Sequence, residues 1–404
     1  MPDHPENPAI RLLDGFFYVG EPLRHFRWMR EHAPVYWDES SRLWGIALHE
    51  DVMRVSKSQA VFCSRRSSRP DSPPLPSMIN MDDPQHKLRR ALVNKGFTKR
   101  RVEDHEVKVR RIVTELIDAV CEKGRCDFVR EIAAPLPMIV IGDLLGVAPE
   151  DRDRLLRWSE EMLAAATATA APELAARAAR AGLEYAQYAL RVIGGRRAKP
   201  PGDDLMSVLV HAEIDSQKLD DEALVHESLL ILVGGDETTR HVITEGMEAL
   251  IRFPEQRERL LRDPSKIPVA VEEMLRWVSP IKNMNRTATR DTTLRGQKIR
   301  EGDKLLLIYP SANRDERVFE DPDVFDVERS PNDHVAFGGY GTHFCLGASL
   351  ARLELRVMFQ ELLRRLPDLE LESEGVRLPL RPNNFIAGIE SMPVVFAPRA
   401  PERR

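Results

Sequence analysis

The sequence predicts a mainly α-helical protein with small β-sheets near both ends, folded as a single domain over residues 1–404. Apolar residues recur mostly at helical spacing from Gln85 to about Val278. Strand-like patterns occur in the first 65 residues and again after residue 285. No shift in composition marks a linker and no internal repeat is found, so nothing divides the chain into separate domains.

The N-terminal region contains both kinds of element. Glu21–His32 has the pattern of a short helix. Two strand-like segments on either side of the polar turn Asp38–Ser41 predict a β-hairpin. The segment Arg65–Pro76 contains four prolines, which break regular structure, and is therefore expected to be a loop.

The middle of the chain is expected to be helical, with two interruptions. Proline and glycine predict breaks in the helical pattern at Ala134–Pro137 and at Lys199–Gly202. A helix ends or begins at such positions because proline cannot donate a backbone hydrogen bond. We therefore expect several successive helices rather than one long rod.

The C-terminal third combines strands with one long helix. Asn285–Pro310 is rich in strand-like residues, with turns expected at Gly296 and Gly302. A glycine-rich loop follows and leads into a helix with one apolar face, formed by Leu346, Leu350, Leu353 and Val357. Turn-rich strands are expected to close the chain.

Charge and cysteine content exclude several classes of protein. The chain has 59 Lys and Arg against 64 Asp and Glu, a formal net charge of -5, which argues against general nucleic-acid binding. Four cysteines cannot form a disulfide framework and no Cys/His set has zinc spacing, so we expect a cytoplasmic protein without a structural metal module. We find no signal peptide and no apolar run of the ~20 residues that span a membrane, and expect no membrane anchor.

A glycine-rich loop before a cysteine is the densest chemical signal, Phe337-Gly338-Gly-Tyr-Gly-Thr-His343-Phe-Cys345-Leu-Gly347. Its glycines let the backbone turn tightly and approach a flat partner closely. The cysteine stands at the start of a helix, whose free N–H groups and dipole lower the pKa of a thiol. A thiolate held in this way is what an axial ligand to haem iron requires. Taken alone, the loop is better explained as an ordinary Gly-rich turn with a free cysteine, and the features below reverse this.

The apolar helical segment Leu229–Thr239 is interrupted by Gly234 and Gly235 and by polar residues. Each glycine inside a helix costs about 1 kcal/mol relative to Ala, which predicts either a close approach or a local kink. The Thr238 hydroxyl can bond back to the carbonyl of Gly234, one turn earlier. Glu237 beside it can relay protons from solvent. Without the cysteine loop, a helix bend with solvated charges would explain the same residues.

Together these motifs resemble the cytochrome P450 superfamily, over nearly the whole chain. The loop before Cys345 looks like the haem-binding signature of the family, with eight positions from Phe337 to Cys345 where the commonest form has seven. The resemblance implies a monooxygenase that uses O2 and haem b, with Cys345 as the ligand of the iron. It also implies that Glu237 and Thr238 protonate iron-bound dioxygen. Further contacts with the cofactor are expected from Gly234, Phe337, Gly338 and Gly347.

Two more sets of residues resemble anchors of this family. Glu273 and Arg276 lie three positions apart on one helix face and look like its ExxR motif, with Arg329 as their third member. These three residues would hold the loop under the haem. Two buried propionates need cationic or N–H donors, and the expected partners are His86, Arg90, Arg286 and His343. Each of these alone could be a solvated surface charge.

Four segments are similar to actinobacterial steroid side-chain hydroxylases: Met78–Pro84, Gly235–His241, Glu273–Trp277 and Glu390–Phe396. The resemblance implies hydroxylation of the terminal methyl, carbon 26 or 27, of cholesterol or cholest-4-en-3-one, and oxidation on to the acid in repeated turnovers. Selectivity for a chain tip needs a narrow channel. Its wall is expected to include Met78, Ile79, Met81, Leu230, Val233, Ile281, Met284, Asn384, Phe385 and Ile386.

A haem domain of this kind uses the whole chain, so electrons should come from separate proteins, a ferredoxin and a ferredoxin reductase. Lys87, Arg89 and Arg352 form a candidate docking patch for such a partner. A fatty-acid hydroxylase is the alternative within the same fold. A haem-thiolate protein without oxygen chemistry, such as a sensor, is a third alternative that the Glu237–Thr238 pair argues against.

Overall fold

The structure is a computed structural model that describes residues 5–165, 171–214, 217–373, 375 and 377–402. The α-helices are α1 (Gly15–Val19), α2 (Pro22–His32), α3 (His49–Lys57), α4 (Gln85–Val93), α5 (Lys99–Asp104), α6 (Glu106–Asp118), α7 (Pro135–Leu145), α8 (Arg152–Ala164), α9 (Pro172–Arg197), α10 (Leu205–His211), α11 (Asp221–Arg252), α12 (Pro254–Arg262), α13 (Ile267–Val278), α14 (Tyr309–Ala312) and α15 (Ala348–Arg365). The short helical turns are η1 (Met78–Asn80), η2 (Asn94–Gly96), the π-helix η3 (Val129–Ala133), η4 (Pro149–Asp151) and η5 (Pro264–Lys266).

The strands are short and scattered along the chain. They are β1 (Val35–Asp38), β2 (Leu43–Ile46), β3 (Phe62–Cys63), β4 (Arg125–Asp127), β5 (Glu213–Ile214), β6 (Gln217–Lys218), β7 (Asn283–Ala288), β8 (Thr292–Leu294), β9 (Gln297–Ile299), β10 (Lys304–Ile308), β11 (Glu370–Leu371) and β12 (Pro393–Val395). The mainly helical fold class with small sheets is therefore confirmed.

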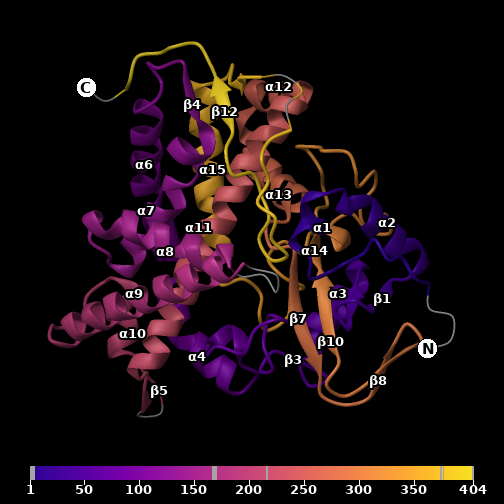
Figure 1. Cartoon of the computed structure of the whole chain (residues 1–404). Helices are drawn as coiled ribbons and strands as arrows, with labels where there is room; N and C mark the ends of the chain where they lie inside the picture. Colours follow the sequence, from indigo (N-terminus) through magenta and orange to yellow (C-terminus); the bar gives the residue numbers. More distant parts are fainter. Residues whose placement is uncertain (1–4, 166–170, 215–216, 374, 376, 403–404) are drawn as a thin grey trace.

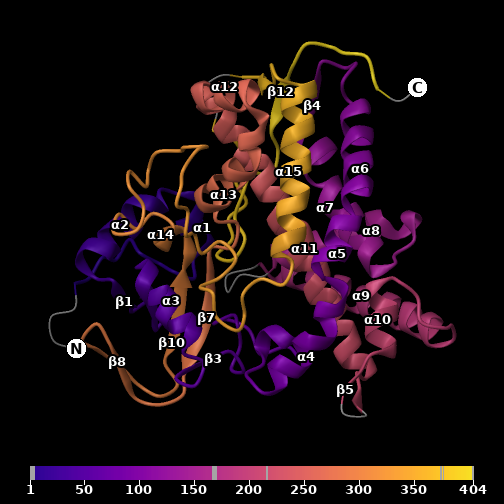
Figure 2. The same ribbon diagram turned by 180° about the vertical axis from the view of Figure 1, so that it is seen from behind.

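Helices and sheet occupy different parts of the molecule. Figure 1 shows α6, α7, α8, α9, α11 and α15 together on one side, and β7 and β10 with α1, α2, α3 and α14 on the other. The view from behind in Figure 2 shows the same division. The largest cluster of buried apolar residues lies among the helices, and a second one lies on the sheet.

The largest sheet has the strand order β1-β2-β10-β7-β3. β1 and β2 form the hairpin that the sequence predicts, with Val35 opposite Ile46. β10 runs parallel to β2 and antiparallel to β7. Because side chains alternate along a strand, Met284 and Arg286 of β7 lie on the same face of the sheet. This face borders the cavity described below.

Helix α11 is the longest helix, and it packs against α7, α13 and α15. Its closest contacts occur at glycines, because a Cβ at Gly235 would lie 2.9 Å from the Ile141 side chain of α7. A Cβ at Gly246 would lie 3.0 Å from Phe359 of α15. These approaches place the polar segment of α11 beside the helix that follows Cys345.

One of the two predicted helix breaks is wrong. Residues 134–137 do not interrupt the helical path, because η3 leads directly into α7 and Pro135 occupies the first turn of that helix. Proline is accepted there since the first N–H groups of a helix have no partner within it. The break at Lys199–Gly202 is confirmed between α9 and α10. Leu346, expected on the last long helix, precedes α15 instead.

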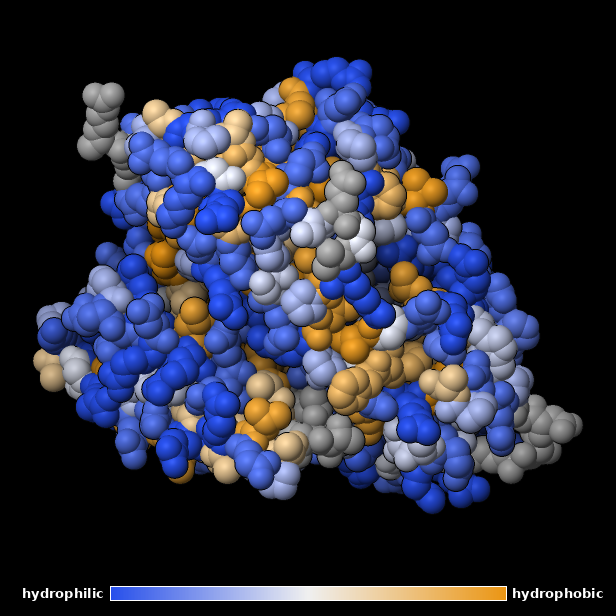
Figure 3. All heavy atoms as spheres, turned by 45° about the horizontal axis from the view of Figure 1, so that its top comes forward, coloured by the Kyte–Doolittle hydropathy of each residue, from blue (hydrophilic) through white to orange (hydrophobic). Residues whose placement is uncertain are grey.

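The surface is mostly polar. Figure 3 shows one face covered largely by hydrophilic side chains, with hydrophobic ones gathered near its centre. Within the described part of the chain, each helix is too short or too polar to cross a membrane.

Candidate active site

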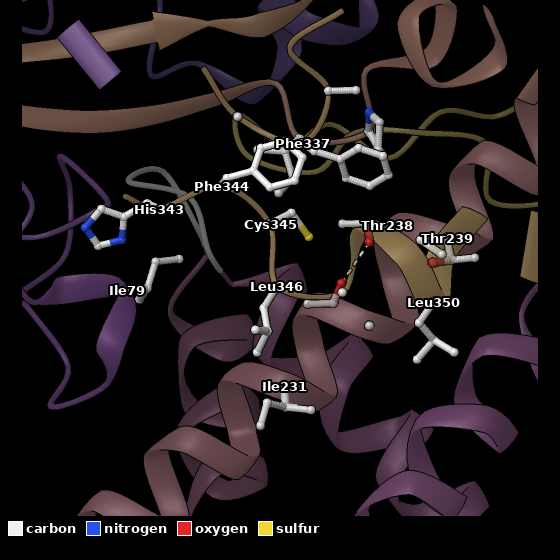
Figure 4. Close-up of a pocket in the computed structure, with 18 of the residues that line it drawn as sticks. Ile79, Ile231, Thr238, Thr239, Phe337, His343, Phe344, Cys345, Leu346 and Leu350 are labelled. Atoms are coloured by element: carbon white, nitrogen blue, oxygen red, sulfur yellow. Dashed lines mark hydrogen bonds between the residues drawn. The ribbon is translucent and has the colours of Figure 1, made fainter. Parts of the chain in front are cut away.

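A cavity lies between α11, α15, β7 and the Cys345 loop, which we define as Phe337–Gly347. Its volume is about 230 Å³, whereas the next pocket holds about 10 Å³, little more than one water molecule. Among the residues expected to bind cofactor or substrate, those that line the cavity are Met78, Ile79, His86, Arg90, Leu230, Gly234, Thr238, Ile281, Met284, Arg286, Phe337, Gly338, His343, Cys345 and Gly347. Figure 4 shows Cys345 and Thr238 facing this common space.

The Cys345 loop is held in a tight turn. Gly338 has a φ of 94°, which glycine adopts without strain, and the Phe337 carbonyl accepts a hydrogen bond from the Cys345 N–H at 2.9 Å. Gly341 allows a different close contact from the one with a flat partner that the sequence predicts. A Cβ at this position would lie 2.1 Å from the carbonyl oxygen of Ser56 in α3. Gly341 therefore allows close approach to the protein backbone rather than to a flat partner.

The thiol of Cys345 faces the cavity and is exposed to it, although it lies well below the outer surface of the protein. The sequence predicts that the pKa of this thiol is lowered. This prediction is wrong when only the groups of the protein act on the thiol. Burial raises the pKa of the Cys345 thiol, although the N–H of Gly347 and the charge of Arg90 act in the opposite direction. A thiolate at this position therefore needs a further positive charge on the cavity side. A metal ion bound by the sulfur would supply that charge, because coordination deprotonates a thiol.

Basic side chains from three separate segments meet at one end of the cavity. His86 and Arg90 belong to α4, Arg286 to β7 and His343 to the Cys345 loop. The rings of His86 and His343 lie 4.1 Å apart. Arg90 also donates a hydrogen bond to the Phe344 carbonyl, which ties α4 to the loop. The structure therefore brings together the four expected propionate partners.

This basic cluster has too few acidic partners of its own. Arg286 donates to the neighbouring Asn285 carbonyl at 2.7 Å, and Nε2 of His343 is buried without a hydrogen-bond partner among the described residues. Burial lowers the pKa of Arg286. Burial and the nearby charge of Arg286 lower the pKa of His343 to about 2. Unpaired buried cations are costly, so the cluster fits the two carboxylates that haem would add.

Helix α11 brings its polar segment to the opposite side of the cysteine. Gly234 faces open space at the cavity, where a Cβ would meet no atom within 4 Å. The Thr238 hydroxyl donates a hydrogen bond to the Gly234 carbonyl at 2.8 Å, the back-bond that the sequence predicts, and it is drawn in Figure 4. The close approach expected in this segment occurs at Gly235, whose missing side chain makes room for Ile141. This arrangement leaves the cavity wall open at Gly234 and presents the Thr238 hydroxyl to the cavity.

Glu237 lies in a different setting from the one expected. It is fully buried, and its Oε2 lies 2.8 Å from Arg240 and 3.4 Å from Arg381. Burial raises the pKa of Glu237, but His241, Arg240 and Arg381 outweigh burial and lower it to about 2. Glu237 is therefore a paired carboxylate that has no direct route to solvent. Any proton has to reach it through another side chain.

Glu273, Arg276 and Arg329 form the buried network that the sequence suggests. Arg276 donates to both oxygens of Glu273, at 2.7 Å each, and Arg329 donates to the same carboxylate at 3.1 Å. The remaining N–H groups of the two arginines bind backbone carbonyls, including that of Val324. Asn313 accepts from Arg276 through its carbonyl and from the Val335 N–H through its side chain. The network thus reaches the segment that enters the Cys345 loop.

Some expected wall residues do not line the cavity: Met81, Val233, Asn384, Phe385 and Ile386. The side-chain oxygen of Asn384 accepts a hydrogen bond from Arg69 at 3.0 Å, and the Arg69 guanidinium lies 4.4 Å from the centre of the Phe385 ring. Ile386 pairs with Ile281 and lies behind it. This polar network holds the segment outside the cavity, so its residues support the wall rather than form it.

Other residues line the cavity without having been expected. Ile231, Thr239 and Val242 lie on the cavity side of α11. The sequence contains a signal for them, because they are three or four positions from Gly234, Gly235 or Thr238 and share a helix face with these residues. Phe97, Ile141, Pro280 and Tyr309 come from other elements, and a local pattern offers no signal for them.

The three candidate docking residues differ in how far their side chains are engaged within the protein. Arg89 lies 3.3 Å from the buried carboxylate of Glu227, and Arg352 donates twice to Glu272 at 2.7 Å. These two arginines are therefore engaged within the protein. Of the three expected residues, Lys87 is the exposed one.

Residues 32–390 match the protein family described as Cytochrome P450. The chain is 50% identical over 397 residues to a Mycobacterium tuberculosis protein named Steroid C26-monooxygenase, an alignment that covers 98% of this chain and 99% of the relative. It is 37% identical over 420 residues to a Mycobacterium bovis protein named Methyl-branched lipid omega-hydroxylase, which covers 97% of this chain and 96% of the relative.

Solved structures agree with these relatives. A Mycobacterium marinum cytochrome P450 in complex with pseudoionone has a TM-score of 0.90 and 34% identity, and covers 98% of this chain and 100% of its own. The protein CYP109E1 from Bacillus megaterium in complex with testosterone has a TM-score of 0.86 and 36% identity, with coverage of 93% and 97%. The chain therefore belongs to the cytochrome P450 family. The predicted enzyme class, a P450 monooxygenase, and a haem-thiolate cofactor are confirmed at this level.

Proposed function

We propose that this protein hydroxylates the terminal methyl group, C26 or C27, of a cholesterol-type side chain. The observation that carries this proposal is the 50% identity with a protein named Steroid C26-monooxygenase along nearly the whole of both chains. The apolar cavity is consistent with a substrate that is almost entirely hydrocarbon. Repeated turnovers would carry the alcohol on to the acid.

The residues present fit haem b, with Cys345 as the iron ligand and the basic cluster around the propionates. His86, Arg90, Arg286 and His343 would supply the donors that two buried carboxylates need. When bound, the haem supplies an oxidant strong enough to break an unactivated C–H bond. Cys345→Ala protein should lose the thiolate-type carbon monoxide spectrum of the reduced enzyme. If that spectrum remained, the proposed ligand would be wrong.

The protein side of the reaction is proton handling at Thr238 and Glu237. The Gly234 carbonyl holds the Thr238 hydroxyl at the cavity, where this hydroxyl can hold a proton and pass it into the cavity. Glu237 is the neighbouring carboxylate that would pass a proton to this hydroxyl, holding it only transiently because its ion pairs lower its pKa to about 2. Its ion pairs with Arg240 and Arg381 keep the carboxylate in one position between transfers.

Selectivity for a terminal methyl has to come from shape, since this group has the strongest C–H bonds of the side chain. The proposed channel wall is formed by Met78, Ile79, Leu230, Ile281 and Met284. Ile281→Ala should widen the channel and lower the share of terminal hydroxylation among the products. Leu88→Ala, at an exposed position of α4, is the matched control and should leave the product distribution unchanged.

Electrons are proposed to come from a ferredoxin and its reductase. Lys87 is the exposed cation of the candidate docking patch. Lys87→Glu should therefore raise the apparent KM for an acidic ferredoxin. This KM should also depend less on the salt concentration than that of the wild type. The described cysteines are unpaired, which is consistent with the reducing conditions of a cytoplasm.

The substrate is tested by titrating the purified ferric enzyme with cholest-4-en-3-one while the Soret band is followed. A long-chain fatty acid and a methyl-branched fatty acid are titrated in parallel. We expect the steroid to give the low-spin to high-spin change of the Soret band at the lowest concentration, because its apolar body fits the apolar cavity. Product analysis then has to place the new hydroxyl at C26 or C27.

A lipid ω-hydroxylase is the second candidate, favoured by the relative named Methyl-branched lipid omega-hydroxylase. That activity also acts on a chain end and uses the same proposed site. A spin shift with the branched fatty acid and none with the steroid would replace the steroid proposal by this one.

A further inference from the structure

Helix α11 carries three titratable side chains at intervals of four residues on one face. Nε2 of His241 lies 3.6 Å from Oε2 of Glu237, and its Nδ1 lies 3.7 Å from Oε1 of Glu245. The ring therefore turns one nitrogen toward each carboxylate. The spacing follows from the helix, in which positions four apart are neighbours.

The His241 ring has no structural partner that explains its burial. It is fully buried, and within the described residues neither ring nitrogen has a hydrogen-bond partner. Oε1 of Glu237 and Oε1 of Glu245 are also buried without a partner. Each such atom costs about 1–3 kcal/mol, so an apolar side chain would serve stability better here. The arrangement indicates a chemical use.

The protein also makes room for this ring. A Cβ at Gly388 would lie 2.0 Å from Nδ1 of His241 and 2.6 Å from Oε1 of Glu245. Any larger residue at position 388 would push the ring or the carboxylate aside. Position 388 is thus occupied by a glycine at the point where His241 and Glu245 meet.

The arginines around Glu237 cannot deliver protons to it. Arg240 leads to Glu160 at 3.2 Å and Arg381 leads to Glu390 at 3.3 Å, both toward more exposed carboxylates. A guanidinium stays protonated in proteins, so it holds the carboxylate without releasing a proton. Of the three described side chains that form ion pairs with Glu237, His241 is the one that can both accept and donate a proton.

We propose that His241 relays protons from Glu245 to Glu237, and through Glu237 to the Thr238 hydroxyl. In one transfer, the Glu245 carboxyl loses its proton to Nδ1 while Nε2 gives its own proton to Glu237. The ring carries one N–H before and after, on Nε2 at first and on Nδ1 afterwards, and proton exchange with solvent returns it to the starting tautomer. Glu245 regains a proton from water, since its side chain is 20% exposed. The proposal rests on the proposed role of Glu237 and Thr238.

The surroundings of His241 keep its ring neutral near pH 7. Burial lowers the pKa of His241, and the charges of Arg240 and Arg381 lower it further, against the effect of Glu237, to about 4. A neutral ring has one donor and one acceptor nitrogen, as a relay requires. A protonated ring would have two donors and could not accept.

The surroundings of Glu245 give it a proton to transfer. Burial raises the pKa of Glu245 to about 7, with Lys282 lowering it and Glu248 raising it. Part of this carboxyl is therefore protonated at neutral pH, which is the condition for an efficient proton donor. The rate of proton delivery should fall as the pH rises through this pKa.

The test compares haem-loaded, full-length variants for product formed per electron supplied and for its pH dependence. His241→Phe and Glu245→Gln keep the size of the side chains but cannot transfer protons. Each should slow product formation about tenfold, less than the ~10²–10⁴-fold effect of a complete general acid, because water can partly replace the relay. The solvent isotope effect should rise, and Glu245→Gln should abolish the pH dependence near 7. Glu245→Asp should restore part of the rate.

Glu222→Gln, at an exposed position in the first turn of α11, is the matched control and should behave like the wild type. Infrared spectra give a readout independent of turnover, because a protonated buried carboxyl absorbs apart from carboxylates. Asp236 also has a raised pKa and contributes to this region, so the Glu245 signal is the part of the absorption that Glu245→Gln loses in the difference spectrum against the wild type.

The outcomes separate the relay from the role of the acid–alcohol pair. Suppose that Thr238→Ala is uncoupled but His241→Phe and Glu245→Gln keep the wild-type rates and pH profiles. The relay would then be overturned, and the role of the acid–alcohol pair would stand. Full coupling in Thr238→Ala would overturn the proposed role on which the relay rests.

Discussion

Two buried charged regions on either side of the cavity differ in how completely they are paired. The Glu273 carboxylate accepts hydrogen bonds from Arg276, Arg329 and Asn332. On α11, by contrast, both oxygens of Asp236 and both ring nitrogens of His241 are buried without a partner among the described residues. Fully paired networks stabilise a structure, whereas unpaired buried polar groups cost stability and persist where function requires them.

This difference explains why the two regions should respond differently to mutation. The Glu273 network connects α13 to the segment before the Cys345 loop, and every bond in it holds backbone in place. Removing a member should therefore unfold or loosen the site. The α11 segment already tolerates missing partners, so changes there should alter proton handling more than folding.

The largest effect is expected when Arg276 is replaced by alanine. Glu273 would then be left as a buried charge with fewer partners, which costs about 3–5 kcal/mol. Denaturant unfolding should show this loss, and the purified protein should contain less haem. Arg262→Ala is the control, since Arg262 forms an exposed pair with Glu258 at 3.5 Å that is worth under ~1 kcal/mol. Equal losses in the two variants would remove the distinction between the regions.

The next effect is expected for Thr238→Ala. This variant keeps the fold and the cavity wall, so substrate should still shift the spin state. Loss of the hydroxyl should lower product per electron about 10²-fold, the lower range for a missing proton donor, and divert electrons to peroxide. Peroxide and product measured in the same reaction check this expectation. Normal coupling would contradict the assignment of Thr238.

The smallest effect is expected for Asp236→Asn, and it should be a gain in stability. Burial and the neighbouring Glu237 raise the pKa of Asp236 well above its usual value. Below the pKa of Asp236 in the unfolded chain, near ~4, this carboxyl is protonated in both states and costs no stability. As the pH rises from there toward the higher pKa of the folded protein, stability is progressively lost. The amide avoids that loss, so the variant should gain about 1 kcal/mol at neutral pH and nothing in acid. A variant less stable at neutral pH would show that the carboxylate has a partner.

The comparison also shows which parts of the site sequence patterns could predict. The Thr238 back-bond and the pairing of Glu273 with Arg276 are correct because both depend on spacing within one helix. The expected direction of the Cys345 pKa shift is wrong because the helix end was weighed without burial, and burial outweighs it. Glu237, expected to relay protons from solvent, is fully buried, and its spacing from Thr238 does not indicate this.

By itself, the sequence determined the local elements, the nature of the Cys345 loop and the groups that share a helix face. Helical and strand geometry repeat every few residues, so these relations are written in short spacings. The tertiary structure decided that Arg286 of β7 and His343 of the loop meet beside α4, that Arg89 is engaged by Glu227, and that Gly388 makes room for His241. These contacts join residues far apart in the chain, and they depend on packing and burial, which no short pattern of residues contains.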